Sequence, residues 1–286
     1  MSSGIVYLVG AGPGAPDLLT LRAARILERA DIVFHDALVH VDTIALAARA
    51  KIVAVGKRCA ATRAAGPSQG SNCGHHGSTA QGFINAQLID AAKRYDVVVR
   101  LKGGDPMLFG RAQDEIAALE AAGIAYEIVP GITAALAASA QIGTSLTQRG
   151  RVRTFTLATP RSGDGESESH WADAFADVDA GALYMGLARR SDVAEHLIAA
   201  GKPASTPVAI VIDASLPTAR VHYTTLGGLA HFEAGDVFGA ALLLIGPQFR
   251  ARPLPGFLST PSRVRGEGEP HARFTVRCEE TLAQAV

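Results

Sequence analysis

Short apolar runs alternate with segments of helical periodicity along the first half of the chain. The runs cover residues 5–9, 32–34, 52–55, 97–99 and 126–129. Between them, apolar residues recur at helical spacing, most clearly over 18–30 and 111–122. Thr20 is expected to cap the first of these helices and Gly123 to end the second. The pattern predicts repeated strand–helix units.

The second half continues this alternation less regularly. Thr133 is expected to cap a helix over 134–141, and a further helix is predicted over 191–200. Strands are predicted over 154–158, 183–186, 208–212 and 241–245, and beyond Pro247 the pattern is lost. We therefore expect two α/β domains, 1–130 and 131–250, with the active site in the cleft between them, and an irregular tail over 251–286.

Composition and charge exclude several classes of protein. The chain has 286 residues and 27 basic against 27 acidic side chains, so no global field favours nucleic acid or a membrane surface. The N-terminal sequence MSSGIVYLVG lacks the features of a signal peptide, and no apolar run is long enough to span a bilayer. We expect a cytoplasmic protein that acts on a small molecule.

Residues 59–82 form a segment of small and polar side chains without a sustained period, and we expect a long loop. Cys59, Cys73, His75 and His76 raise the question of a zinc site there. Their spacing matches no compact ligand pattern, and the chain has only 3 cysteines. We interpret them as loop residues and expect no metal.

Candidate chemistry lies in the loops that follow the strands. The segment RLKGGDPMLFG, residues 100–110, follows an apolar strand, and ligands bind at that edge of open α/β sheets. Gly103 and Gly104 let the backbone approach a ligand closely, while Asp105 adds a carboxylate. The alternative is an ordinary well-made turn.

A nicotinamide enzyme is the main alternative for the first loop, GAGPGAP. Gly10, Gly12 and Ala15 formally satisfy G-x-G-x-x-A, and Asp36 stands where a ribose-binding acid is expected. Pro13 and Pro16, however, remove backbone N–H donors that a diphosphate needs, and Asp17 would repel it. The loop therefore favours a ligand without phosphate.

In combination, the strand-end motifs resemble those of the uroporphyrinogen-III C-methyltransferase family, the tetrapyrrole methylases that use S-adenosylmethionine. In chain order they are GAGPG, HDALV, VGKR, RLKGGDP with LFGR, VPGITAA and YMG. The likeness covers about residues 4–247. The chain departs from the family pattern at Ala15, where Asp is usual, and at RAQDE (111–115), TQR (147–149) and ATP (158–160).

The resemblance implies a homodimer that binds S-adenosylmethionine and methylates uroporphyrinogen III to precorrin-2, in sirohaem or cobalamin biosynthesis. Another precorrin methylase is the alternative. The resemblance also implies that Asp36 is the proton acceptor and Lys57 the proton donor. The implied cofactor residues are Pro13, Gly103, Gly104, Asp105, Leu108, Thr133, Ala134, Met185, Ala214 and Ala241.

The implied chemistry suits these residue types. A sulfonium methyl group is already activated, so the protein must mainly align it with a carbon nucleophile and exclude water. The methylated pyrrole carbon has no proton to lose, so one must be removed elsewhere on the macrocycle, and a carboxylate such as Asp36 can accept it. Because the substrate carries many carboxylates, cations near the loop ends are candidate substrate ligands: Arg22, Arg58, Lys102, Arg111 and Arg149.

Overall fold

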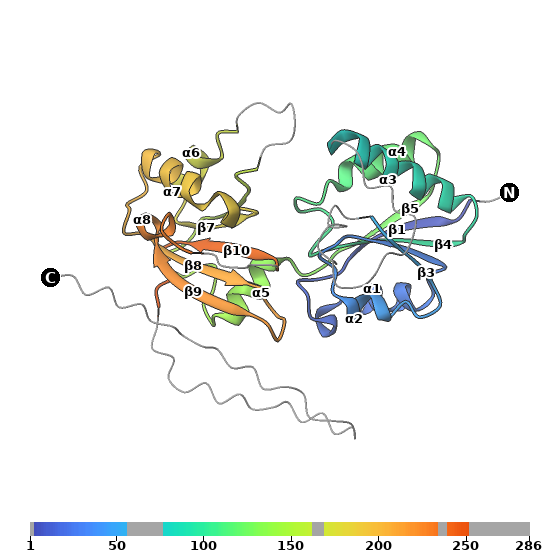
Figure 1. Cartoon of the computed structure of the whole chain (residues 1–286), viewed down its shortest axis with the longest axis horizontal. Helices are drawn as coiled ribbons and strands as arrows, with labels where there is room; N and C mark the ends of the chain where they lie inside the picture. The colour runs from blue at the N-terminus through green and yellow to red at the C-terminus, as the bar shows by residue number, and fades with distance from the viewer. Residues whose placement is uncertain (1–2, 56–76, 162–168, 234–238, 252–286) are drawn as a thin grey trace, which may run out of the picture. The chain divides into compact units, whose positions relative to one another are not determined.

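The computed structural model describes residues 3–55, 77–161, 169–233 and 239–251 (Figure 1). These residues form two compact units, and the division falls between Ala137 and Ala138. We call them the first unit and the second unit, and each is described by itself. Within the described ranges, no helix combines the length and the apolar character needed to cross a membrane.

The first unit is built on a five-stranded sheet in the order β3-β2-β4-β1-β5, in which every neighbouring pair is parallel. The strands are β1 (Ile5–Gly10), β2 (Ile32–His35), β3 (Lys51–Ala54), β4 (Val97–Lys102) and β5 (Tyr126–Val129). The helices are η1 (Pro16–Leu18), α1 (Leu21–Glu28), α2 (Val41–Ala45), α3 (Gly77–Ala92) and α4 (Ala112–Ala121).

Both faces of this sheet are covered by helices. Tyr7 and Val9 of β1 belong to a core cluster with residues of α1, whereas Val6 and Leu8 pack on the opposite face with residues of α3 and α4. Figure 1 accordingly has α1 and α2 along one face and α3 and α4 along the other. A strand buried on both faces needs apolar residues at successive positions, which explains the unbroken run in β1.

The second unit contains a mixed five-stranded sheet in the order β6-β7-β10-β8-β9. Its strands are β6 (Phe155–Ala158), β7 (Ala180–Tyr184), β8 (Pro207–Ile212), β9 (Arg220–Thr225) and β10 (Ala241–Ile245). Only β6 and β7 pair in parallel, and the other three pairs are antiparallel. Its helices are α6 (Trp171–Ala176), η2 (Leu187–Arg189), α7 (Arg190–Ala199) and α8 (Leu226–Leu229), and α5 (Ala134–Gln141) contains the division between the units.

A core cluster of buried residues joins α6, α7 and α8 to the sheet. Phe175 of α6, Leu197 of α7 and Leu226 of α8 are buried together with Ile210 of β8 and Leu243 of β10. The prediction of an α/β fold is confirmed for both units. Antiparallel pairing, which needs no crossover helix, is the feature that the alternation of strands and helices did not predict.

The predicted helix ends agree with the structure at two positions. The Thr20 hydroxyl accepts a hydrogen bond from the backbone N–H of Ala23 at 3.1 Å, as an N-cap does. Gly123 follows α4 with a φ of 66°, the left-handed conformation that commonly ends a helix.

Several elements differ from the prediction, among them helices α6 and α8, which were not predicted. Helix α3 begins at Gly77, so residues 77–82 are helical and do not belong to the long loop expected over 59–82. Strand β9 was not predicted, because its sequence RVHYTT interleaves polar residues and its burial is largely partial. It is an edge strand that pairs only with β8, so it needs no continuous apolar run.

Candidate active site

Four predicted loops follow neighbouring strands of the first unit. Asp36 follows β2, Gly103 and Gly104 follow β4, Pro13 follows β1, and Thr133 follows β5. Because these strands are parallel and adjacent, their carboxyl ends lie along one edge of the sheet. Ligands of open α/β sheets bind at this edge. The fold therefore gathers residues that are distant in sequence.

The glycine loops after β1 and β4 contact each other through their backbones. Gly12 donates to the carbonyl of Gly104 at 3.1 Å, and Gly104 donates to the carbonyl of Gly12 at 2.7 Å. Both residues are left-handed, with φ of 72° and 66°. A Cβ on Gly10 would lie 2.6 Å from the Cα of Gly131 in the loop after β5. Only glycine permits three loops to approach this closely.

Asp105 connects two of these loops through its carboxylate. One oxygen, Oδ1, accepts from the backbone N–H of Met107 at 2.8 Å, and Oδ2 accepts from that of Gly131 at 2.9 Å. The residue is half-buried. Asp105 therefore fixes the loop after β4 against the loop after β5.

Asp36 is held by a buried ion-pair network. Its Oδ1 accepts from the Arg100 guanidinium at 2.5 Å, and Arg100 Nε donates to Glu115 at 2.8 Å. Lys102 Nζ donates to the other Glu115 oxygen at 2.9 Å. The side chains of Arg100, Lys102 and Glu115 are at most 3% exposed, whereas that of Asp36 is 31% exposed. Of the four, Asp36 is the one most open to a ligand.

Burial and charge act in opposite directions on the two cations. Burial alone would lower the pKa of Arg100, but the charges of Asp36 and Glu115 outweigh it, and the pKa is raised. The pKa of Lys102 is lowered, first by burial and then by the neighbouring Arg100 charge, although Glu115 offsets part of this effect. Arg100 is thus a permanent cation beside Asp36.

The sequence contained a signal for Arg100 and Glu115 that we did not use. Arg100 interrupts the apolar run VVVRLK of β4, and Glu115 lies on the buried face of α4 together with Ile116 and Leu119. A charged residue at a position that periodicity assigns to the core is almost always paired. Such positions identify buried ion pairs before a structure is known.

The structure does not favour Lys102 as a substrate ligand. Its ammonium group is buried and bound to Glu115, so it does not present a charge to solvent. Arg111 and Arg149 are exposed, and Arg111 pairs with Asp114 on α4. Lys57 and Arg58 lie outside the described residues, as do Cys59, Cys73, His75 and His76.

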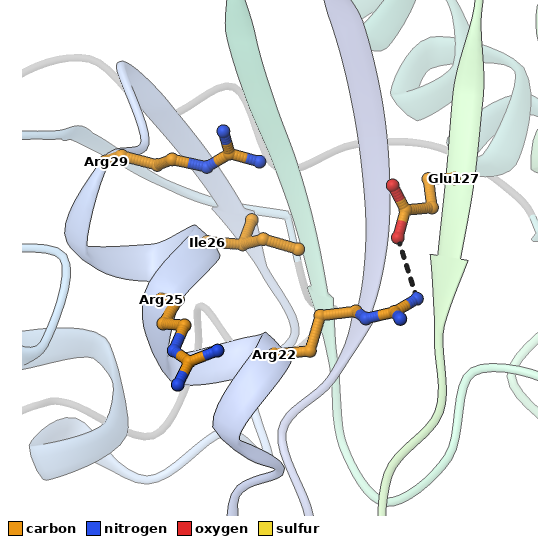
Figure 2. A pocket seen from close by; sticks show the side chains of 5 residues that line it. All are labelled: Arg22, Arg25, Ile26, Arg29 and Glu127. Carbon is orange, nitrogen blue, oxygen red and sulfur yellow. Dashed lines mark hydrogen bonds and ion pairs between the residues drawn. The ribbon is translucent and has the colours of Figure 1, made fainter.

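Arg22 lies on the flank of the first unit. It lines an open depression of about 410 Å³ with Arg25, Ile26 and Arg29 of α1 and with Glu127 of β5. Figure 2 shows the ion pair between Arg22 and Glu127, whose atoms are 3.1 Å apart. Arg29 donates to the Tyr7 hydroxyl at 3.2 Å. Two of the three arginines therefore already have protein partners.

The remaining predicted cofactor residues of the first unit lie at the same sheet edge. Pro13, Leu108, Thr133 and Ala134 are all half-buried. Helix α5 begins at Ala134, directly after Thr133. Helix α1, by contrast, begins only at Leu21, after η1, so no α-helix starts at the glycine loop as a dinucleotide site requires. This arrangement weighs against the nicotinamide alternative.

In the second unit, sheet register brings three predicted cofactor residues to one edge. Met185 follows β7 directly, Ala214 follows β8 closely, and Ala241 begins β10. Strand β10 runs antiparallel between the other two, with Leu242 opposite Tyr184 and Ala241 opposite Ile212. The start of β10 therefore lies beside the ends of β7 and β8.

Strained backbone marks the same loops. Among the described residues, the non-glycine positions with positive φ are Phe109, Arg111, Met185, Asp213 and Ser215. They follow β4, β7 and β8, and such conformations cost about 1–3 kcal/mol each unless the side chain tolerates them. Strain of this kind clusters at functional sites. Met185 has a backbone φ of 57° and is 42% exposed, so an open side chain stands on a strained backbone position.

Solved methyltransferases have this fold. A uroporphyrin III C-methyl transferase from Thermus thermophilus matches with a TM-score of 0.70 and 34% identity, over 85% of this chain and 92% of that one. A structure of the enzyme from that organism complexed with S-adenyl homocysteine matches with a TM-score of 0.69 and 35% identity, at the same coverage. The chain therefore shares the two-sheet α/β fold of these methyltransferases over most of their length.

The family follows from the sequence match. The family described as Tetrapyrrole (Corrin/Porphyrin) Methylases matches residues 5–230. A siroheme synthase from Psychrobacter sp. is 42% identical over 247 residues, which cover 86% of this chain and 48% of that protein. The chain belongs to the tetrapyrrole methylase family, and the resemblance seen in the motifs is confirmed. The chain spans about half the length of the siroheme synthases that it matches.

Proposed function

We propose that the chain is an S-adenosylmethionine-dependent C-methyltransferase that converts uroporphyrinogen III to precorrin-2. The proposal rests on one observation at the sheet edge of the first unit. The loops of Gly12 and Gly104, which bind each other, lie along the same edge as the partly exposed Asp36 carboxylate. The fold is that of a uroporphyrin III C-methyl transferase over 92% of that protein's length. By this function the chain would serve sirohaem or cobalamin biosynthesis.

The proposed cofactor residues suit a ligand without phosphate. The glycine crossing brings backbone close to the site without a Cβ, and the first α-helix after β1 starts six residues after Ala15 rather than at the loop. In the first unit the proposed residues are Pro13, Gly103, Gly104, Asp105, Leu108, Thr133 and Ala134. In the second unit they are Met185, Ala214 and Ala241. When bound, S-adenosylmethionine supplies an activated methyl group.

In the proposed reaction, Asp36 accepts a proton from the macrocycle. Attack by a pyrrole carbon leaves a fully substituted, positively charged carbon, so the macrocycle must lose a proton elsewhere. The Asp36 carboxylate is 31% exposed and is held in place by its ion pair with Arg100. Such general-base help is worth about 10²- to 10⁴-fold in rate. Lys57 is the proposed proton donor.

The substrate's carboxylates require cations, and we propose Arg22, Arg58, Arg111 and Arg149 for this role. Arg111 is exposed and follows the loop that contains Gly103 and Asp105. An arginine can bind a carboxylate through two parallel hydrogen bonds, which fixes the orientation of the substrate. Lys102 is left out of this set because its ammonium group is buried.

Assembly, location and domain limits belong to the same proposal. We propose a cytoplasmic homodimer of subunits with domains at 1–130 and 131–250 and an irregular tail over 251–286. The basis is the family resemblance together with the loss of sequence pattern beyond Pro247. Sedimentation of the purified chain tests the dimer directly.

Methylation of a later tetrapyrrole intermediate is the second candidate. A cobalt precorrin-4 methyltransferase matches with a TM-score of 0.71 and 25% identity, over 96% of its length. One experiment separates the two functions. The chain is incubated anaerobically with labelled S-adenosylmethionine and either uroporphyrinogen III or precorrin-2, and product masses are recorded. Label in the first product alone supports our proposal, whereas label in the second alone supports the alternative.

A further inference from the structure

Glu115 is a fully buried carboxylate that the proposed reaction does not use directly. Its side chain is 0% exposed, and its two oxygens accept from Arg100 Nε at 2.8 Å and Lys102 Nζ at 2.9 Å. Gln81 also donates to Oε1, at 3.3 Å. Burying three charges involves a desolvation penalty that well-packed apolar residues would avoid. The network therefore needs an explanation other than stability.

The geometry of Arg100 supplies that explanation. Its guanidinium is planar and binds in three directions: to Glu115, to the backbone carbonyl of Leu101 at 3.2 Å, and to Asp36. The first two contacts fix the plane of the group. The third then fixes where the Asp36 carboxylate lies, because a charge-assisted hydrogen bond to a rigid donor constrains its acceptor.

The carboxylate form of Glu115 is essential to this arrangement. Both of its main partners are cationic donors, and a carboxylate offers one acceptor oxygen to each. An amide of the same shape offers one acceptor and one donor, so one cation would face an N–H group. Arg100 would then lose its fixed plane or share its charge differently with Asp36.

We propose that Glu115 is a positioning residue, which acts through Arg100 to hold the Asp36 carboxylate in the orientation needed to accept a proton. The inference rests on the proposed function, because it assigns Glu115 a role only through the proposed proton acceptor. Because Glu115 is fully buried and bound to Arg100 and Lys102, we assign it a role only through its partners and not through contact with a ligand.

A double-mutant cycle tests the inference in the full chain. Glu115→Gln is expected to lower kcat with uroporphyrinogen III about 10- to 100-fold, the size of effect that a misplaced catalytic group produces. In the Asp36→Asn background the same substitution is expected to change kcat by less than about twofold, since two residues that act as one unit are not additive. Affinity for S-adenosylhomocysteine should stay within about twofold throughout.

Glu120→Gln is the matched control. Glu120 lies on the same helix and is exposed. It accepts a hydrogen bond from the Tyr126 hydroxyl at 2.6 Å, and Tyr126 does not belong to the buried ion-pair network. It should leave kcat unchanged. If Glu115→Gln lowered kcat equally with and without Asp36, a merely structural role would be established and the inference overturned.

A second variant keeps the test decisive if Glu115→Gln does not fold. Arg100→Lys retains the cation but loses the planar fork, and the same cycle with Asp36→Asn applies to it. Loss of kcat that disappears in the Asp36→Asn background supports the inference, and equal loss in both backgrounds contradicts it. Failure of the wild-type chain to methylate uroporphyrinogen III would instead contradict the proposed function.

Discussion

At the scale of single residues, the two aspartates at the sheet edge, Asp36 and Asp105, make different contacts. Asp105 uses both carboxylate oxygens to bind backbone N–H groups, whereas Asp36 binds one arginine and stays partly open to solvent. The two aspartates should therefore respond differently to substitution. Asp105 holds loops together, and Asp36 is available for proton transfer.

Asp36→Asn should lower turnover without weakening the cofactor complex. The amide retains the size and one acceptor of the carboxylate but cannot take up a proton, so kcat should fall about 10²- to 10⁴-fold. Calorimetry with S-adenosylhomocysteine should give an unchanged Kd. A comparable loss of affinity in this variant would mean that Asp36 contributes to the cofactor site instead.

Asp105→Ala should weaken cofactor binding and stability together. It leaves the backbone N–H groups of Met107 and Gly131 without their acceptor, at a cost of about 1–3 kcal/mol for each one that stays buried. The affinity for S-adenosylhomocysteine, measured by calorimetry, should fall because the two loops are no longer tied. Unchanged affinity in a less stable variant would restrict Asp105 to a purely structural role.

At the scale of elements, the loops matter through their backbone conformation. Gly104 and Gly123 form a matched pair, because both have a φ of 66° but only Gly104 lies in the glycine crossing. A Cβ on Gly104 would have its nearest neighbour 3.9 Å away, and one on Gly123 would have none within 4 Å. The two positions differ in their surroundings, not in intrinsic strain.

Gly104→Ala and Gly123→Ala should therefore destabilise the fold equally, by about 1–2 kcal/mol, since each forces alanine into the left-handed region. Only Gly104→Ala should weaken binding of S-adenosylhomocysteine. Urea unfolding gives the stability and calorimetry gives the affinity. Equal affinities in the two variants would remove the glycine crossing from the cofactor site.

The start of the second unit's sheet contains a pH-sensitive contact. Asp179 accepts from the backbone N–H groups of Thr154 and Arg153 and from the Thr154 hydroxyl, and these bonds lower its pKa. Because the folded pKa lies below the unfolded value of about 3.8, the contact contributes stability above that pH. The contribution is lost as pH falls through the folded pKa.

Asp179→Asn should consequently be less stable than the wild-type chain at neutral pH and should lose less stability on acidification below about pH 4. Urea midpoints measured across this range test the expectation. Asp90→Asn is the control, because it alters an exposed ion pair between Asp90 of α3 and Lys93, the residue that follows this helix. If the urea midpoints of the wild-type chain and of Asp179→Asn changed in parallel with pH, the proposed role of Asp179 would be contradicted.

How far the elements could be predicted depended on how they are buried. Strands covered on both faces, such as β1 and β4, have apolar runs that identify them directly. The edge strand β9 and the first turns of α3 have small or polar residues and were missed. The Asp36 loop was found from its motif. The interrupted apolar patterns mark Arg100 and Glu115 as buried charges, but only the folded structure shows that Arg100 pairs with both Asp36 and Glu115.

At the scale of the whole molecule, ligand specificity separates the proposed function from its alternative. A ligand that binds only the folded state stabilises it by RT ln(1 + [L]/Kd), about 2.7 kcal/mol at a concentration of 100 Kd. S-adenosylhomocysteine should therefore raise the Tm of the chain, while NAD at the same concentration should not. A shift with NAD alone would revive the dinucleotide interpretation of the glycine loop.

The parallel sheet of the first unit also bears on how the chain folds during synthesis. Strand β1 precedes both of its neighbours, since Ile5 pairs with Val97 and Val6 pairs with Tyr126. The ribosome therefore releases an apolar strand long before its partners emerge. Pairings of such long sequence separation form slowly, and the waiting segment is prone to aggregate. Nascent chains that end before β5 should bind chaperones, whereas chains that include β5 should not stay bound.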